Sequence, residues 1–222
     1  MLKVDLHTHS KASPDGGIST DEYIKVIGES KLDYVAVTDH DTIKLASALH
    51  KTLGDKVIIG EEITCQEGEL IGLFLDKEIK SGMSVLDTAK AIKKQGGLVY
   101  IPHPFETVRK GITKGALESI KELVDIVEVY NGRAYLQNKG PEATVWARLN
   151  DKVTAASSDA HGVKGLSTAF NILNKPPTAS NLIEQLKTGQ MNMQRPPVRT
   201  LLYPKAHRLR QKMTKKIKRL KR

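Results

Sequence analysis

The fold is decided by the stretch LKVDLHTHS at residues 2–10, which reads as a β-strand that ends in two histidines. In an extended chain, side chains two residues apart point the same way, so His7 and His9 can hold one ion together. Imidazole and carboxylate groups are ligands of divalent transition metals, and the tip of a strand is a rigid place to mount them. The start of the chain therefore predicts part of a metal site.

The same arrangement recurs along the chain, where other apolar, β-branched runs also end in polar, metal-ligating types. These runs and their ends are 34–38 with His40, 56–63 with Glu62, 98–102 with His103, 126–130 with Asn131, and 153–157 with Asp159 and His161. In barrels built from βα units, ligands and catalytic groups sit at the C-terminal rim of the strands. We therefore expect these side chains to meet at one rim.

Helix-like stretches alternate with the strand-like runs, which include 2–6 and 168–173 and number seven in all. The expected helices are 19–30, 42–53, 85–95, 114–123, 134–149 and 178–188. This alternation predicts βα units and a largely parallel sheet, and seven strands in so short a chain favour a small barrel over an open sheet. We expect residues 69–75 to pair with the third strand as a short antiparallel hairpin.

Composition indicates one soluble globular domain, since the 222 residues are 39% hydrophobic and 27% charged. No apolar run approaches the roughly 20 residues of a membrane span, and no signal peptide is visible at the start. The single cysteine, Cys65, excludes an internal disulfide and fits a reducing compartment. We expect a cytoplasmic protein, with Cys65 as a small buried residue and not a nucleophile.

The charge is concentrated at the C-terminal end. Ten of the 35 Lys and Arg residues lie between Lys205 and Arg222 with no acid among them, which leaves 25 basic and 25 acidic residues in the first 204. Apolar residues recur there at helical spacing: Leu209, Met213, Ile217 and Leu220. We expect a catalytic barrel at 1–200 and a basic tail at 201–222, either amphipathic or disordered.

The expected role of the tail is contact with nucleic-acid phosphates, an anionic membrane surface or a partner's groove; the alternative is a solvated end. Because the rest of the chain is net neutral and its motifs end at His161, we expect removal of residues 205–222 to leave the barrel folded and small-substrate hydrolysis intact.

The candidate donors exceed what one four-coordinate zinc needs, so the sequence predicts two or three metal ions. Such clusters lower the pKa of a bridging water and neutralise a phosphoryl group under attack.

Six motifs carry a resemblance to a known family: DLHTHS at 5–10, VTDHD at 37–41, GEEI at 60–63, PHP at 102–104, VEVYN at 127–131 and SSDAH at 157–161. In this order they resemble the PHP (polymerase and histidinol phosphatase) domain family over roughly residues 1–190. The resemblance implies an α/β fold, a distorted seven-stranded β/α barrel, whose trinuclear Mn, Zn or Fe centre hydrolyses phosphoesters.

The resemblance also implies how the ligands are grouped. One metal would be held by His7, His9, Glu62 and Asp159. Glu62 would bridge to a second metal held with His103. Asp15, His40 and His161 would hold the third.

Two positions depart from the family pattern. The loop that carries Asp15 is one residue longer than in many members, so Asp15 is either a ligand or a turn aspartate before Gly16-Gly17. Glu69 stands where many members have a histidine. It is either a carboxylate ligand that favours a harder ion such as Mn²⁺ or a solvated surface residue.

Arg133, two residues after Asn131, is a candidate phosphate clamp, because its guanidinium fork matches phosphate oxygens; the alternative is an ion pair in the first turn of the next helix. We expect a phosphoesterase in which a hydroxide bridging two ions attacks phosphorus, Arg133 binds phosphoryl oxygens, and Asp159 or His161 assists proton transfer. The expected substrate is a nucleotide or short oligonucleotide, since the resemblance is to nucleotide phosphoesterases. Alternatives are a histidinol-phosphate or phosphotyrosine phosphatase, and a regulatory module docking to nucleic acid or membrane.

Overall fold

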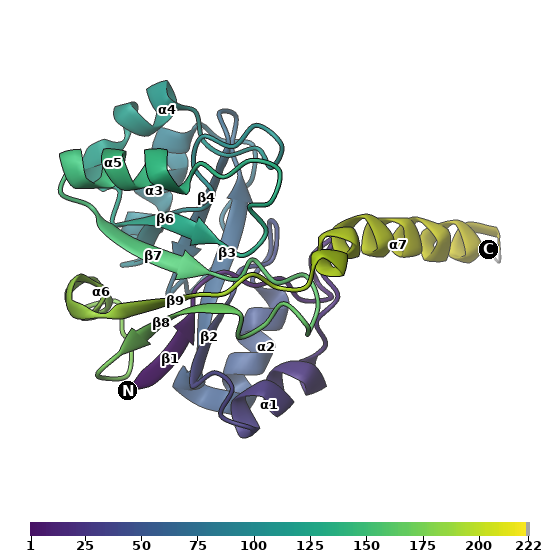
Figure 1. The fold of residues 1–222 in the computed structure, drawn as a ribbon. Helices are drawn as coiled ribbons and strands as arrows, with labels where there is room; N and C mark the ends of the chain where they lie inside the picture. Colours follow the sequence, from purple (N-terminus) through teal and green to yellow (C-terminus); the bar gives the residue numbers. More distant parts are fainter. Residues whose placement is uncertain (221–222) are drawn as a thin grey trace.

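A computed structural model describes residues 1–220, and the side chains of α7 up to Thr214. It is built around one nine-stranded sheet in the order β7-β6-β5-β4-β3-β2-β1-β8-β9. The strands are β1 Leu2–Asp5, β2 Tyr34–Val37, β3 Val57–Thr64, β4 Glu69–Leu73, β5 Leu98–Ile101, β6 Ile126–Asn131, β7 Val153–Ser157, β8 Ala169–Leu173 and β9 Gln190–Met193. The sheet curls into a nearly closed barrel with helices on its outer side (Figure 1).

The predicted α/β barrel is confirmed, but the count of seven strands is wrong. The parallel pairs β1–β2, β2–β3, β5–β6 and β6–β7 are joined by helices, as the alternation predicted. The hairpin is confirmed: β4 pairs antiparallel with β3, from Thr64 opposite Glu69 to Gly60 opposite Leu73. The ninth strand, β9, pairs antiparallel with β8. Its sequence, QMNM, has neither the β-branched content nor the clean alternation that indicates a strand.

The helices are α1 Thr20–Gly28, α2 Lys44–Leu53, α3 Val85–Lys94, α4 Lys114–Ser119, α5 Gly140–Leu149, α6 Leu182–Thr188 and α7 Tyr203–Leu220, with 3₁₀ turns at Gly54–Lys56, Lys121–Leu123 and Val198–Leu202. The six helices expected from the sequence are shorter than predicted: α1, α2, α5 and α6 begin later than expected, whereas α3 and α4 begin at the expected residue and end earlier. The predicted helix at 134–149 begins only at Gly140, with Pro141 in its first turn, where the fixed φ of proline is compatible with a helix start. The start of α1 can be read from the sequence, since Ser19 and Glu22 form a reciprocal capping box at its N-terminus.

Apolar side chains fill the barrel and the space between sheet and helices. One cluster takes residues from every strand between β1 and β8 and from α6, among them Leu6, Tyr100 and Leu182, all fully buried. Two further clusters lie under the outer helices. This packed interior supports the polar rim above it.

The barrel closes between β7 and β8 without a regular ladder. The side-chain amide of Asn171 on β8 bridges the seam: its nitrogen donates to the carbonyl of Ala156 at 2.9 Å, and its oxygen accepts from the amide of Ala156 at 3.0 Å. Nearer the rim, Thr8 and Ala160 form a parallel bridge, and the amide of His9 donates to Ala160 at 2.8 Å. The segments after β1 and β7 therefore meet directly.

The C-terminal segment forms the helix α7, and the role of the tail stays a prediction. α7 stands clear of the barrel at its far end, while its first turns touch the rim (Figure 1). Ile217 and Leu220, which we expected on its apolar face, lie outside the residues whose side chains are described, and Lys221 and Arg222 lie outside the structure's described range. No helix among residues 1–220 is both long enough and apolar enough to cross a bilayer.

Candidate metal centre

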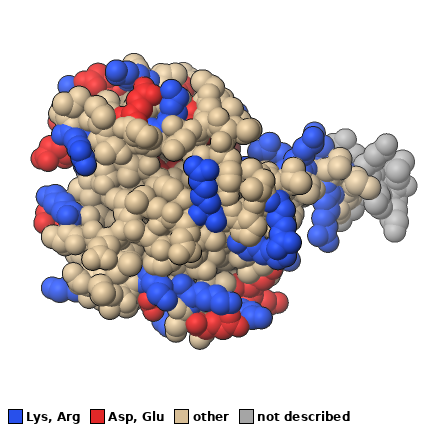
Figure 2. All heavy atoms as spheres, viewed as in Figure 1, with Lys and Arg blue, Asp and Glu red and all other residues tan. Residues whose placement is uncertain are grey.

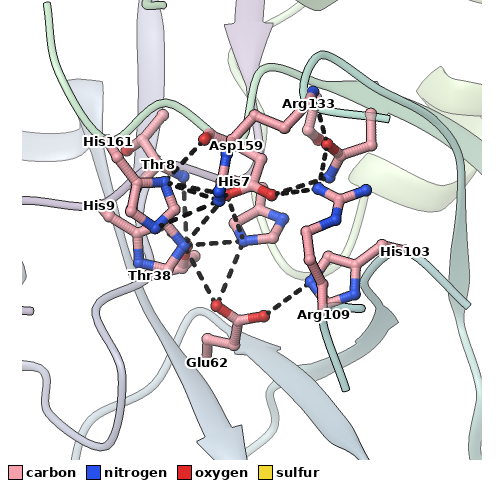
Figure 3. A network of polar contacts seen from close by, with 12 residues as sticks. His7, Thr8, His9, Thr38, Glu62, His103, Arg109, Arg133, Asp159 and His161 are labelled. Atoms are coloured by element: carbon pink, nitrogen blue, oxygen red, sulfur yellow. Dashed lines mark hydrogen bonds and ion pairs between the residues drawn. The ribbon is translucent and has the colours of Figure 1, made fainter. Parts of the chain in front are cut away.

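The structure brings the predicted donors together at the C-terminal rim of the barrel (Figure 3). Their ligand atoms form three overlapping groups, each within 4.8 Å: His9, Asp15, His40 and His161; His7, Glu62 and His103; and His7, His9 and Asp159. All are buried except His40, which is partly exposed. Side chains from six separate segments therefore share one small volume.

Glu62, at the end of β3, lies between the groups. Its Oε1 is 3.1 Å from Nε2 of His103, while its Oε2 is 3.1 Å from Nε2 of His9 and 3.4 Å from Nδ1 of His40. Burial opposes ionisation, but the surrounding imidazoles hold the pKa of Glu62 well below its usual range. Each carboxylate oxygen thus faces a different set of donors, which is the arrangement a bridging ligand needs.

Asp159 adds a second buried carboxylate opposite Glu62. Its Oδ1 lies 3.7 Å from Nε2 of His7 and 3.5 Å from Nε2 of His9. Despite burial, the charges of Arg133 and His7 hold the pKa of Asp159 well below its usual range. The carboxylate is therefore an ionised donor.

The donors fit divalent cations. Nε2 of His7 and Nε2 of His9 face each other at 3.0 Å, and burial with the nearby His161 lowers the pKa of His9 to about 3, so His9 presents neutral imidazole. Nδ1 of His9 and Nδ1 of His103 are buried without a hydrogen-bond partner among the described residues. Despite burial, the charges of Asp159, Glu62 and Glu128 instead raise the pKa of His7, so a cation bound there would take the place of a proton. Imidazole nitrogens and ionised carboxylates together form the N/O ligand set that suits Mn, Zn or Fe.

Glu128, on β6, is the most important residue that sequence reasoning did not assign. Its Oε1 is 3.2 Å from Nδ1 of His7 and accepts from the hydroxyl of Tyr100 at 2.9 Å. Its Oε2 accepts from the amide of His103 at 2.7 Å and from Nδ2 of Asn131 at 2.8 Å. A carboxylate on Nδ1 fixes the ring and directs the Nε2 lone pair of His7 into the centre.

Two more buried aspartates hold the ligand loops. Asp5 accepts from the amide and hydroxyl of Ser158 at 3.1 and 2.5 Å, and Asp39 accepts from the amide and hydroxyl of Ser10 at 2.6 and 2.5 Å. Burial raises the pKa of Asp5 to about 7 and that of Asp39 to about 6. Asp5 and Asp39 therefore fix the backbone next to the metal ligands and are not metal ligands themselves.

Asp15 lies within the site, as the resemblance implied. Its Oδ1 is 3.5 Å from Nε2 of His161 and 3.7 Å from Nε2 of His40. The same oxygen accepts from the hydroxyl of Ser13 at 3.0 Å, so the turn interaction and the position among the donors coexist.

Glu69 is not a solvated surface residue, since only 5% of it is exposed. Burial and the neighbouring charge of Glu62 raise the pKa of Glu69 to about 9. Its Oε1 is 4.0 Å from Nδ1 of His40, but it belongs to none of the three donor groups. Its role as a ligand stays a prediction.

Arg133 points into the site and not along a helix. Its Nη1 is 3.4 Å from Oδ1 of Asp159 and 3.2 Å from Nδ1 of His161. The helix that follows begins seven residues later, at Gly140, so the expected alternative of an ion pair in its first turn is wrong. The ion pair it does form places the guanidinium beside the donors.

Arg109 is a second arginine at the site, and nothing in the sequence pointed to it. Its Nη1 donates to Asn131 and to Oδ2 of Asp159, both at 2.6 Å, and its other nitrogens bind Glu106 at 2.7–2.9 Å. It lies in the irregular segment between β5 and α4, where no periodicity or motif marks it.

A cavity of about 500 Å³ opens above the donors. It is lined by His, Asp and Glu side chains of the centre and by cationic side chains from two loops and from α7: Arg109, Lys110, Arg133, Lys205 and Arg208. An anion drawn in by these charges would come to rest on the donor groups.

The sequence model of the PHP domain family matches residues 5–188 of this chain. This chain belongs to the PHP domain family. An uncharacterized protein of Methanocaldococcus jannaschii is 34% identical over 150 residues, which cover 62% of this chain and 88% of that protein.

Two solved structures show the same fold. A two-domain protein of Bacteroides vulgatus containing a predicted PHP-like metal-dependent phosphoesterase aligns with a TM-score of 0.70 and 19% identity, covering 87% of this chain and 65% of that one. The lesion-specific endonuclease of Pyrococcus furiosus aligns with a TM-score of 0.60 and 15% identity, covering 86% and 57%. The fold and the family predicted from the motifs are thus confirmed.

Proposed function

We propose that this PHP-domain chain is a metal-dependent phosphoesterase that hydrolyses a nucleotide or short oligonucleotide. One observation carries the proposal: members of all three groups of His, Asp and Glu ligands line a cavity that is also lined by five Lys and Arg side chains. Divalent cations bound there would neutralise phosphoryl oxygens and lower the pKa of water. Metal ligands next to cationic side chains are the arrangement that phosphoester hydrolysis requires, since the metals act on the phosphoryl group and the cationic side chains bind its oxygens.

The donor groups would hold two to three cations (Mn, Zn or Fe), with His7, Glu62 and His103 around one, His7, His9 and Asp159 around a second, and His9, Asp15, His40 and His161 around a third. Asp159 and His161 are the proposed groups for proton transfer, since both line the cavity. The nearly complete donor set counts against a purely regulatory module.

The two arginines would have different roles. Arg133 has a buried Nε without a partner among the described residues, and its Nη1 makes only longer contacts, to Asp159 at 3.4 Å and to His161 at 3.2 Å, so its guanidinium remains available for phosphoryl oxygens. Arg109 is already bound to Glu106, Asn131 and Asp159, so it holds Asp159 in place.

The cavity walls favour a substrate with more than one phosphate. Besides the two arginines, Lys110 from the loop after β5 and Lys205 and Arg208 from α7 line the cavity. Additional phosphates of an oligonucleotide would be bound there. The lesion-specific endonuclease among the structural neighbours supports a nucleic-acid substrate.

The test is metal analysis of the purified protein, followed by phosphate release from nucleotides, oligonucleotides, histidinol phosphate and phosphotyrosine. We expect two to three bound transition metals and highest kcat/KM on nucleotides or oligonucleotides. His103→Ala should lose metal and hydrolysis, whereas His50→Ala, which changes a histidine bonded to the carbonyl of Val57 away from the cavity, should keep both. Full hydrolysis after exhaustive chelation would refute the proposal, and a preference for phosphotyrosine or histidinol phosphate would replace its substrate.

A further inference from the structure

The helix α7 packs with its polar side against the barrel and its apolar side toward solvent. Toward the barrel, Nη2 of Arg208 is 2.5 Å from Oδ2 of Asp15, and Nε2 of Gln211 donates to the carbonyl of Ser13 at 3.0 Å. On the other side, Leu209 and Met213 are 60% and 58% exposed. A terminal helix of a soluble domain normally buries its apolar stripe on the body, so this stripe is left for another surface.

The apolar stripe begins before the helix does. Leu202, in the preceding 3₁₀ turn, is 65% exposed and stands seven residues before Leu209, which stands four before Met213. The spacing of four places Leu209 and Met213 on one face of α7. Exposed apolar side chains therefore occur both at the start of the helix and along it.

Cationic side chains flank the stripe. Arg210 and Lys212 lie next to Leu209 and Met213 in α7, whereas Lys205 and Arg208 line the cavity, and the sequence has no acid after Glu184. Figure 2 shows the blue side chains gathered along the projecting helix with tan ones between them. The partner must therefore offer negative charge and an apolar layer along the same line.

We propose that α7 docks this chain onto an anionic lipid surface, with the helix in the plane of the interface, Leu202, Leu209 and Met213 in the acyl boundary, and Arg210 and Lys212 at the headgroups. A polynucleotide would neutralise the charges but leave the apolar row in water. A second copy would place another run of positive charge beside the first, with no acid to offset it. An anionic bilayer satisfies both requirements.

The docking is shallow and reversible. No Trp, Tyr or Phe follows Tyr203 in the sequence, and Tyr203 itself, the first residue of α7, is half-buried against Gly162. The exposed part of the helix therefore has no aromatic side chain to anchor it at the headgroup level. Three apolar side chains and a cluster of cations should give binding that weakens with salt and depends on lipid charge.

The experiment is flotation of the full-length protein with phosphatidylcholine vesicles, with and without about 30% phosphatidylserine, at low and high salt. The diagnostic variant is Leu209→Gln with Met213→Gln, which removes apolar surface and leaves the charge unchanged. The matched control is Leu149→Gln, at an apolar side chain on α5 that is 80% exposed. All three positions are at the surface, so circular dichroism should show unchanged folding.

We expect binding to anionic but not neutral vesicles, and a fall of roughly tenfold or more for the double variant, from lost apolar burial, while Leu149→Gln binds as wild type. Equal vesicle binding by the double variant, or no vesicle binding at all, overturns the proposal. A dimer that the double variant loses would assign the stripe to a second copy. Oligonucleotide binding that the double variant loses would assign it to nucleic acid.

Discussion

Replacing Glu128 by glutamine tests whether a carboxylate outside the donor groups controls the centre. The side chain keeps its shape, but one of its two oxygens becomes an NH₂ group that cannot accept a hydrogen bond. Facing His7 and Tyr100, that group leaves Nδ1 of His7 without an acceptor, while Tyr100 can still donate to Oγ of Ser157 at 2.7 Å. The opposite orientation would strand the amide of His103 and Nδ2 of Asn131, so the first is favoured.

One stranded buried donor costs about 1–3 kcal/mol in the free energy of unfolding. The effect on metal affinity is separate. Without an acceptor at Nδ1, His7 is no longer held in the form that carries its proton there, so the Nε2 lone pair is less available to a cation. Loss of such an outer partner typically lowers metal affinity by about 10–100-fold.

The assay is urea unfolding of the metal-free protein, together with titration of Mn²⁺ or Zn²⁺ followed by calorimetry. Glu184→Gln is the control, because that carboxylate is exposed on α6 and pairs only with Lys187 among the described contacts. If Glu128→Gln binds metal with wild-type affinity and unfolds at the wild-type urea concentration, the role we assign to Glu128 is wrong.

Four further changes probe the site and the tail. In metal-free protein Glu69→Gln should raise the melting temperature at pH 7. Burial raises the pKa of Glu69 to about 9, so above the usual pKa of 4.5 the carboxyl ionises more readily in the unfolded chain and destabilises the fold. Lower metal occupancy in the same variant would make Glu69 a ligand, and an unchanged melting temperature with unchanged occupancy would remove Glu69 from the site. Arg133→Lys keeps the charge but loses the fork, so kcat/KM should fall by about 1–3 kcal/mol in transition-state binding, and an equally active Arg133→Ala would contradict the phosphate role. Burial raises the pKa of Cys65 to about 11, so the thiol should stay protonated at pH 8 and react with a thiol reagent many times more slowly in the folded protein than in denaturant; equal rates would show that it is accessible. Deletion of residues 205–222 should now lower metal occupancy or hydrolysis as well as polyanion binding, because Arg208 contacts Asp15; unchanged small-substrate kinetics would restore the expectation of an independent tail.

The sequence was sufficient to predict the metal ligands at the rim, but not the residues that hold those ligands in place. Donors such as His7, His103 and Asp159 each follow a strand, so the order of strands and the rule for βα barrels bring them together. Glu128 could not be placed in this way, since the pairing of β6 with β7 is irregular between Glu128 and Tyr130, and simple alternation fails there. Arg109 acts from a loop whose path only the assembled protein defines.

The tail shows the same limit from another side. Helical spacing predicted an amphipathic tail, and among the residues with described side chains Leu209 and Met213 lie on an exposed face of α7. Spacing does not tell which side of a helix meets the body, and the natural expectation, apolar side inward, is reversed by the contacts of Arg208 and Gln211. Those contacts depend on loops at residues 10–17 that are remote in the sequence.

The seam between β7 and β8 gives the centre a mechanical property. At that line the cylinder is held by the amide of Asn171 and, higher up, by the bridge between Thr8 and Ala160. The bridge stands between two pairs of donors, His7 with His9 on one lip and Asp159 with His161 on the other. Movement of one segment along the other would therefore change the distance between the two pairs of ligands directly. A shear of the barrel at this line would alter the metal-binding geometry before it disturbed the apolar interior.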